Sequence, residues 1–247
     1  MQNMNKGQRA TEFFTGARAT IPLILGAIPF GIMFGTVAVN AGITPWGSVA
    51  MSLFVFAGSG QFIAAGLVSQ GIQTGFIILT TFVVNLRHAL YSASLAPFMH
   101  RLPQRWLLPL GFWLTDETYA VVIKRYSEKD SSPCKHWFHF GSSVAMYLSW
   151  QLCTILGVLA GRAIPDATGW GLDFAMVATF IGIVVPMIAS YPMLIAALSA
   201  GSSALLFNEL PNKAGLMIAA LVGIAAGYIA ESIKTARRGK PVPEEEL

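Results

Sequence analysis

Two pairs of ionisable side chains interrupt the apolar sequence, Arg87-His88 and Asp116-Glu117. A guanidinium and a carboxylate can form an ion pair, whereas a further carboxylate or an imidazole can take up and release protons. Two acids face one permanent cation, so one acid or His88 remains able to titrate. We expect Arg87 to pair with Asp116 or Glu117, and the sequence leaves open which one. The alternative is a purely structural pair that locks two helices together.

A second polar group, Gly58-Ser59-Gly60-Gln61, also lies inside an apolar run. Glycine costs a helix about 1 kcal/mol relative to alanine, so two glycines this close favour a broken helix. The free N–H groups at the start of the second half can hold a substrate carboxylate inside the membrane. We expect Ser59 to cap this half-helix and Gln61 to reach the ligand. The alternative is close helix packing through small residues.

Three further residues complete the candidate site. Asn85 can coordinate a substrate or hydrogen-bond to a neighbour, and both readings stay open. Tyr91 follows the Arg-His pair by about one helical turn and can serve as packing or as a ligand. Phe30, with Phe34 and Phe62, can form an apolar pocket for a substrate side chain.

The elements that position these residues must cross a membrane. The chain has 247 residues, of which 54% are hydrophobic and only 11% charged. Residues 19 to 86 contain no Asp, Glu, Lys, Arg or His, and as helix they would extend roughly 100 Å, about three times a hydrocarbon core of roughly 30 Å. The apolar runs do not alternate with period two, which favours helices over barrel strands. The expected class is an all-α, polytopic membrane protein with at least one broken helix.

We expect about eight transmembrane helices, with seven as an alternative because some pieces are short. The expected crossings are Thr20–Asn40, Pro45–Leu67, Gly75–Pro97, Trp106–Ile123, Trp137–Gly161, Leu172–Ala189, Pro192–Phe207 and Ala214–Glu231. The third and fourth are joined by a short turn, and Arg87 and Asp116 each lie roughly 16 Å from it. The cation and the acids should therefore meet at one depth, near mid-membrane.

The loop charges predict the orientation, because cytoplasmic loops carry an excess of Lys and Arg. With both termini inside, most basic residues fall on the cytoplasmic side, although Arg101 and Arg105 fall on the opposite one. We expect a cytoplasmic segment at residues 1–19, one transmembrane domain at 20–231 and a cytoplasmic tail at 232–247. Basic residues at span ends do not favour nucleic acid as a partner. We expect neither a cofactor nor a metal site.

The motifs resemble the AzlC family of branched-chain amino acid permeases. The resemblance covers essentially the whole chain. It rests on the Pro- and Gly-rich segment 28–35, on Phe-Ala-Gly-Ser-Gly-Gln-Phe at 56–62, on Asn-Leu-Arg-His at 85–88 and on Asp116-Glu117. It implies an inner-membrane exporter of L-valine, leucine, isoleucine and methionine, and a small, separately encoded AzlD-type membrane partner.

A zwitterionic substrate suits the residues. The Gly58–Gln61 break can hold the carboxylate, an acid at 116 or 117 the ammonium and the phenylalanines the side chain. We expect secondary export coupled to protons through the ionisable cluster of Arg87, His88, Asp116 and Glu117. Two alternatives remain. One is an intramembrane hydrolase using Ser59 and His88, which lacks a glycine at position 57; the other is a channel or a non-transporting assembly subunit.

Overall fold

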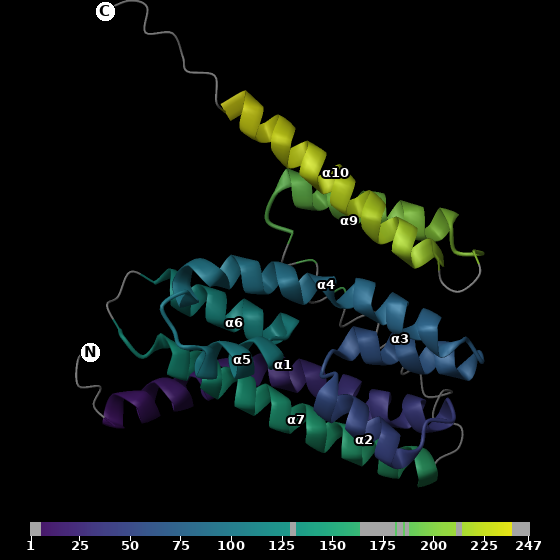
Figure 1. Ribbon diagram of the computed structural model, residues 1–247, viewed down its shortest axis with the longest axis horizontal. Helices are drawn as coiled ribbons and strands as arrows, with labels where there is room; N and C mark the ends of the chain where they lie inside the picture. Colours follow the sequence, from purple (N-terminus) through teal and green to yellow (C-terminus); the bar gives the residue numbers. More distant parts are fainter. Residues whose placement is uncertain are drawn as a thin grey trace, which may run out of the picture. The chain divides into compact units, whose positions relative to one another are not determined.

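All regular structure in the described residues is helical, which confirms the all-α class. The computed structural model describes residues 6–128, 132–163, 181, 185, 188–210 and 214–238. The chain forms two compact units, Met1–Met176 and Val177–Leu247. The helices, drawn in Figure 1, are α1 (Lys6–Asn40), α2 (Pro45–Phe54), α3 (Gly58–Ser69), α4 (Thr74–Met99), α5 (Gln104–Phe112), α6 (Asp116–Ser127), α7 (Lys135–Ala163), α9 (Tyr191–Leu206) and α10 (Ala214–Arg238).

Four helices in the described residues are long and apolar enough to cross a membrane. They are Lys6–Asn40, Thr74–Met99, Lys135–Gly161 and Ile218–Ala236. A membrane protein is therefore confirmed. The expected crossing Leu172–Ala189 lies almost entirely outside the described residues, so the total number of crossings stays a prediction.

Helices α1 and α7 pack side by side and run in the same direction. Thr20 hydrogen-bonds to Ser142 with 2.6 Å between the two hydroxyl oxygens, and Thr36 donates to the Gly157 carbonyl at 3.0 Å. Residues later in α1 therefore contact residues later in α7, so the two helices are parallel. Small residues allow this close approach. A Cβ added to any of six glycines would meet the other helix: Gly16, Gly31, Gly35, Gly141, Gly157 and Gly161.

Helices α2 and α3 form a hairpin instead of one broken crossing. The Gln61 amide donates to the Ser52 hydroxyl at 2.9 Å, whereas nine residues along a continuous helix would separate them by about 13 Å. The reversal occurs at residues 55–57, where Phe56 has a φ of 45°. Gly58 then lies against Trp150. The chain returns to the end of the bundle from which α2 started, as Figure 1 shows.

Side chains of α7 bind the backbone groups that the end of α2 leaves open. The last carbonyls of any helix lack partners within it. Here Gln151 donates to the Ser52 carbonyl at 2.9 Å and Tyr147 to the Leu53 carbonyl at 3.0 Å. The hairpin is therefore held from α7, which makes a chain reversal compatible with an apolar surrounding.

Helix α4 runs antiparallel to α1, and α5 and α6 form a second hairpin at its far end. Near its middle, α4 contacts the start of α3, and its last turns pack with Tyr126 near the end of α6 and Phe138 in the first turn of α7. Trp106, at the start of α5, also lies beside the start of α7, 4.9 Å from the Trp137 ring centre. Both ends of the α5–α6 pair therefore lie at the same end of the bundle.

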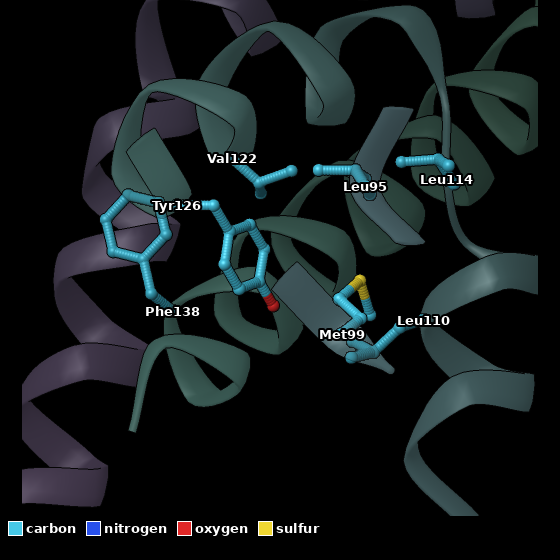
Figure 2. Packing of buried hydrophobic residues seen from close by; sticks show 7 residues of the cluster. All are labelled: Leu95, Met99, Leu110, Leu114, Val122, Tyr126 and Phe138. Atoms are coloured by element: carbon cyan, nitrogen blue, oxygen red, sulfur yellow. The ribbon is translucent and has the colours of Figure 1, made fainter. Parts of the chain in front are cut away.

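An apolar cluster ties this second hairpin to its neighbours. Figure 2 shows its members facing one another from α4, α5, the turn before α6, α6 and α7. They are Leu95, Met99, Leu110, Leu114, Val122, Tyr126 and Phe138. Each is at least nine-tenths buried, so the hairpin is a packed part of the unit.

The first unit therefore contains two similar halves of opposite direction. In each half, one long helix is followed by two short ones separated by three residues, 55–57 in the first and 113–115 in the second. The first interruption, at 55–57, lies next to the expected break at 58–61, but its two pieces fold back on each other. The segments Pro45–Leu67 and Trp106–Ile123, which we expected to cross once each, instead return to the side they came from. Each short helix is about 14 to 18 Å long, about half the hydrocarbon core.

The second unit holds α9 and α10, which pack against each other. Gly223 lies against Ala200, and Gly227 lies against Ala196. Large apolar side chains elsewhere on both helices are exposed, for example Leu198 and Ile224.

Candidate functional site

The site centres on Arg87, in the middle of α4. Its guanidinium lies 2.9 Å from the Asp116 carboxylate and donates to the Ser59 hydroxyl at 2.7 Å. The side chains of Arg87 and Asp116 are 26% and 19% exposed. Of the two acids, Asp116 is thus the partner. Ser59 belongs to the first turn of α3 and Asp116 to the first turn of α6, so one cation joins the starts of two half-helices.

The start of α6 concentrates negative charge at a helix N-terminus. The Thr115 hydroxyl caps the helix by accepting from the Thr118 N–H at 3.3 Å, and Asp116 and Glu117 occupy the first turn. The helix dipole favours acids at this position. We had expected one continuous helix from 106 to 123, and this half-helix was missed. Threonine followed directly by two acids is a helix-start signal that could have revealed it.

Tyrosines from α4 and α6 extend the polar site on one side. Tyr91 donates to Asp116 at 2.6 Å and stacks on Tyr119, with 4.5 Å between ring centres. The Tyr119 hydroxyl in turn lies 2.9 Å from that of Ser94. Tyr91 is therefore a polar partner of the acid as well as a packing residue. Both oxygens of Asp116 have partners, Arg87 on one and Tyr91 on the other.

Asn85 and His88 flank the cation. The Asn85 amide lies over Gly60, where an added Cβ would come within 2.9 Å of its oxygen. That oxygen is buried and lacks a hydrogen-bond partner among the described residues. The His88 ring bonds to the Asn85 carbonyl at 3.1 Å and meets the Tyr91 ring edge-on.

Ser59 does not cap α3 as expected, and Gln61 has hydrogen-bond partners within the protein. Ala57 occupies the cap position of α3 and makes no side-chain cap hydrogen bond, and Ser59 bonds to Arg87 instead. Gln61 is fully buried; its amide nitrogen donates to Ser52, and its oxygen accepts from the Trp150 indole at 3.2 Å. Gln61 therefore braces the hairpin.

The expected aromatic group lies on α1 and α3. Phe34 and Phe62 meet edge-to-face at 5.8 Å between ring centres, and Phe34 and Phe30 are buried. Phe62 thus belongs to α3, the half-helix that starts at the polar site.

The serine–histidine pair of the hydrolase alternative is not formed. In the described part of the chain, Ser59 bonds to Arg87, and the His88 ring bonds to a backbone carbonyl. Among the described residues, no three or more His, Cys, Asp or Glu side chains cluster in a way suited to a metal ion.

The family model described as "AzlC protein" matches residues 22–164. The chain belongs to the AzlC family. The matched region runs from within α1 to the end of α7, so it contains the whole candidate site and both hairpins.

Proteins of several organisms are similar to this chain. The inner membrane protein YgaZ of Escherichia coli is 25% identical, with 94% of each chain covered. An uncharacterized membrane protein of Archaeoglobus fulgidus is 31% identical over 89% of this chain and 96% of its own length. The branched-chain amino acid transport protein AzlC of Bacillus subtilis is 29% identical over 74% of this chain and 71% of its own. No solved structure matches the chain significantly.

Family membership and the apolar helices together make this chain a membrane protein of a transport family. Its similar proteins are named for membrane location or transport and not for a catalytic reaction.

Proposed function

We propose that this protein is a secondary transporter that exports L-valine, leucine, isoleucine and methionine across the inner membrane, driven by protons. The observation that carries the proposal is that the starts of α3 and α6 meet at the ion pair of Arg87 and Asp116. Transporters commonly bind substrate near mid-membrane at the N-termini of interrupted helices that belong to inverted repeats. The branched-chain preference follows from the name of the Bacillus subtilis relative.

The two half-helices suit the two charged ends of an amino acid. The first turn of α3 leaves the N–H groups of Gly58, Ser59 and Gly60 outside its hydrogen-bond ladder, and the helix dipole adds positive potential. A carboxylate can bind there, with the Asn85 amide beside it. The ammonium can bind at the acids that begin α6. Tyr91 holds Asp116 in place for this contact.

The apolar side chain of the substrate contacts the aromatic group of Phe30, Phe34 and Phe62 in this proposal. These rings pack tightly in the described conformation. Admission of a substrate therefore requires the α2–α3 hairpin to shift. Gln61 acts in this proposal as the residue that positions that hairpin.

Glu117 is the group that we propose to carry the coupling proton. Asp116 is held by Arg87 and Tyr91, whereas Glu117 has no ion pair among the described residues. His88 is the second candidate because its imidazole titrates near neutrality in water. One proton moving inward across 100 mV releases about 2.3 kcal/mol, enough for roughly a 50-fold gradient of a zwitterion.

In this proposal the N-terminus and the C-terminus both lie on the cytoplasmic side of the membrane. The hairpin arrangement supports it. Because the α2–α3 hairpin returns to the side it came from, α4 runs back to the N-terminal end of the bundle, and Arg101 and Arg105 fall on the same side as Lys6 and Arg9. The two arginines that contradicted the charge bias now agree with it. We retain the transmembrane domain at 20–231 with cytoplasmic ends at 1–19 and 232–247.

The exporter in our proposal has a second component, a small AzlD-type membrane subunit. The family resemblance is the argument for it. The exposed apolar faces of α9 and α10 provide surface that such a partner, or lipid, can cover.

Transport of radiolabelled valine by purified protein in liposomes tests the proposal, with and without the small subunit. We expect accumulation that responds to the pH gradient and the potential, together with counterflow. Glu117→Gln should abolish gradient-driven accumulation but keep counterflow, whereas Asp116→Asn should abolish both. Flux that ignores both gradients would refute proton coupling. Passive conductance without counterflow would indicate a channel, and the absence of any flux with the partner present would indicate an assembly role.

A further inference from the structure

A cavity opens towards the N-terminal end of the first unit, and none of its lining residues belongs to the ion pair. Its volume is about 510 Å³, and it lies between α1, α5 and α7. Its lining residues are Arg9, Arg105, Trp106, Pro109, Trp113, His136, Trp137 and Phe140. Arg9 comes from the first turns of α1, and Arg105 and Trp106 come from the start of α5.

The described lining residues of this cavity are rich in hydrogen-bond donors and include no acid. Arg9 and Arg105 carry permanent positive charge. The Nε of Arg9 and the indole nitrogens of Trp113 and Trp137 are buried and lack hydrogen-bond partners among the described residues. Buried donors without partners are costly, so a ligand that accepts from them gains affinity.

An acid close to Arg9 along α1 is already engaged. Glu12, one turn after Arg9 on α1, binds the Arg125 guanidinium at 2.5 Å and accepts from the Ser132 hydroxyl at 2.8 Å. It is not part of the cavity lining. Among the described residues Arg9 and Arg105 form no ion pair, so their positive charge can attract an anion from outside the chain.

The rest of the lining is aromatic. Trp106 meets Trp137 edge-to-face at 4.9 Å and Phe140 at 5.6 Å, and Trp113 lies 5.8 Å from Phe140, all between ring centres. Tryptophans favour the headgroup level of a membrane, where one part of the ring is apolar and the N–H is wet. The cavity begins beside Trp137 in the first turn of α7, where that candidate span starts.

We propose that this cavity binds the phosphate headgroup of an anionic phospholipid from the leaflet on the N-terminal side. The arginines and the Trp137 indole N–H donate to the phosphate oxygens, and the other tryptophan and phenylalanine rings contact the glycerol and upper acyl carbons. Basic pockets between membrane helices bind anionic headgroups by the same chemistry. This proposal is independent of the transported substrate.

Tryptophan fluorescence locates the lipid. Three of the six tryptophans in the chain line the cavity. Purified protein is titrated with brominated phosphatidylglycerol or brominated phosphatidylcholine in mixed micelles. We expect the anionic lipid to quench at a several-fold lower mole fraction. Equal quenching by the two lipids would overturn the proposal.

Variants test the named contacts, with native mass spectrometry as the readout of bound lipid. Arg9→Gln and Arg105→Gln should each lower phosphatidylglycerol retention about fivefold, because one basic residue at a membrane surface contributes about that factor. Trp137→Phe keeps the ring but removes the donor and should also lower retention. Arg101→Gln is the matched control, since this exposed arginine precedes α5 without lining the cavity. Equal effects of Arg101→Gln and Arg105→Gln would refute the site.

Soluble competitors distinguish other occupants. Millimolar inorganic phosphate should leave bound lipid unchanged, because it lacks the apolar part. Displacement of the lipid by phosphate would show a free-anion site, and displacement by valine would show a substrate vestibule; either result overturns the lipid proposal. Size-exclusion profiles equal to wild type establish that each variant is folded.

Discussion

Arg87 in the middle of α4 holds Asp116 at the first turn of α6, with 2.9 Å between Nη1 and Oδ2. The other terminal nitrogen of Arg87 bonds to Ser59 at the first turn of α3. A single guanidinium therefore connects both hairpins to the helix that lies between them along the chain.

Removal of either charge should abolish transport and lower stability. Arg87→Ala or Asp116→Asn leaves one charge without its partner in a poorly hydrated site, at a cost of about 3 kcal/mol. We expect valine flux to fall more than tenfold and the melting temperature in detergent to drop. Arg101→Gln, a cation in an exposed loop, should change neither quantity. Wild-type flux in both variants would show that the pair has no role in transport.

Tyr91→Phe should reduce transport more than Tyr119→Phe. Both substitutions keep the stacked rings, but the first removes a 2.6 Å hydrogen bond to Asp116, whereas the second removes one to Ser94. A hydrogen bond to a charged group contributes about 1.5–3 kcal/mol, so a loss of about tenfold or more in flux is expected for Tyr91→Phe. For Tyr119→Phe we expect less than about threefold. The reverse order would contradict the assigned role of Tyr91.

Gln61→Leu should destabilise the α2–α3 hairpin. It removes the bonds to Ser52 and Trp150, and a buried indole N–H left without an acceptor costs about 1–3 kcal/mol. We expect a lower melting temperature in detergent and reduced counterflow. Gln70→Leu is the matched control, because Gln70 is exposed and bonds only locally, to the Gly66 carbonyl. If the two variants melt alike, the brace is not needed for stability.

Cysteine accessibility tests the hairpins directly. Thr44→Cys and Gln70→Cys flank the first hairpin and should react with impermeant maleimide from the same side of the membrane, while Arg101→Cys reacts from the other. A single crossing by 45–67 would place Thr44 and Gln70 on opposite sides.

Burial raises the pKa of the Cys134 thiol, so at pH 7 less of it is thiolate than of an exposed cysteine. This native cysteine should therefore react slowly with the maleimide.

The charged cluster could be predicted from sequence because charge inside an apolar run is costly and therefore conspicuous. Arg87, Asp116 and the glycines at 58 and 60 were all visible in that way. The partner choice could not be predicted, because Asp116 and Glu117 are adjacent in sequence. Only the direction of α6 decides that Asp116 faces the cation.

The hairpins were missed for a physical reason. Two half-length helices and one crossing have the same total length and the same hydropathy, so residues 104–127 fit either arrangement. Two signals pointed to the hairpins. The cap sequence at Thr115 marks a new helix in the second hairpin. Arg101 and Arg105 contradict the charge bias unless the chain turns back earlier, in the α2–α3 hairpin.

The two hairpins, α2–α3 and α5–α6, start from opposite ends of the bundle. Each reversal fills only about half the thickness of the hydrocarbon layer. In the proposed transport, the two hairpins would form two thin barriers in series, with Arg87 between them. A carrier requires two barriers that do not open at the same time. Because Arg87 bonds to both hairpins, movement of one hairpin would depend on the conformation of the other.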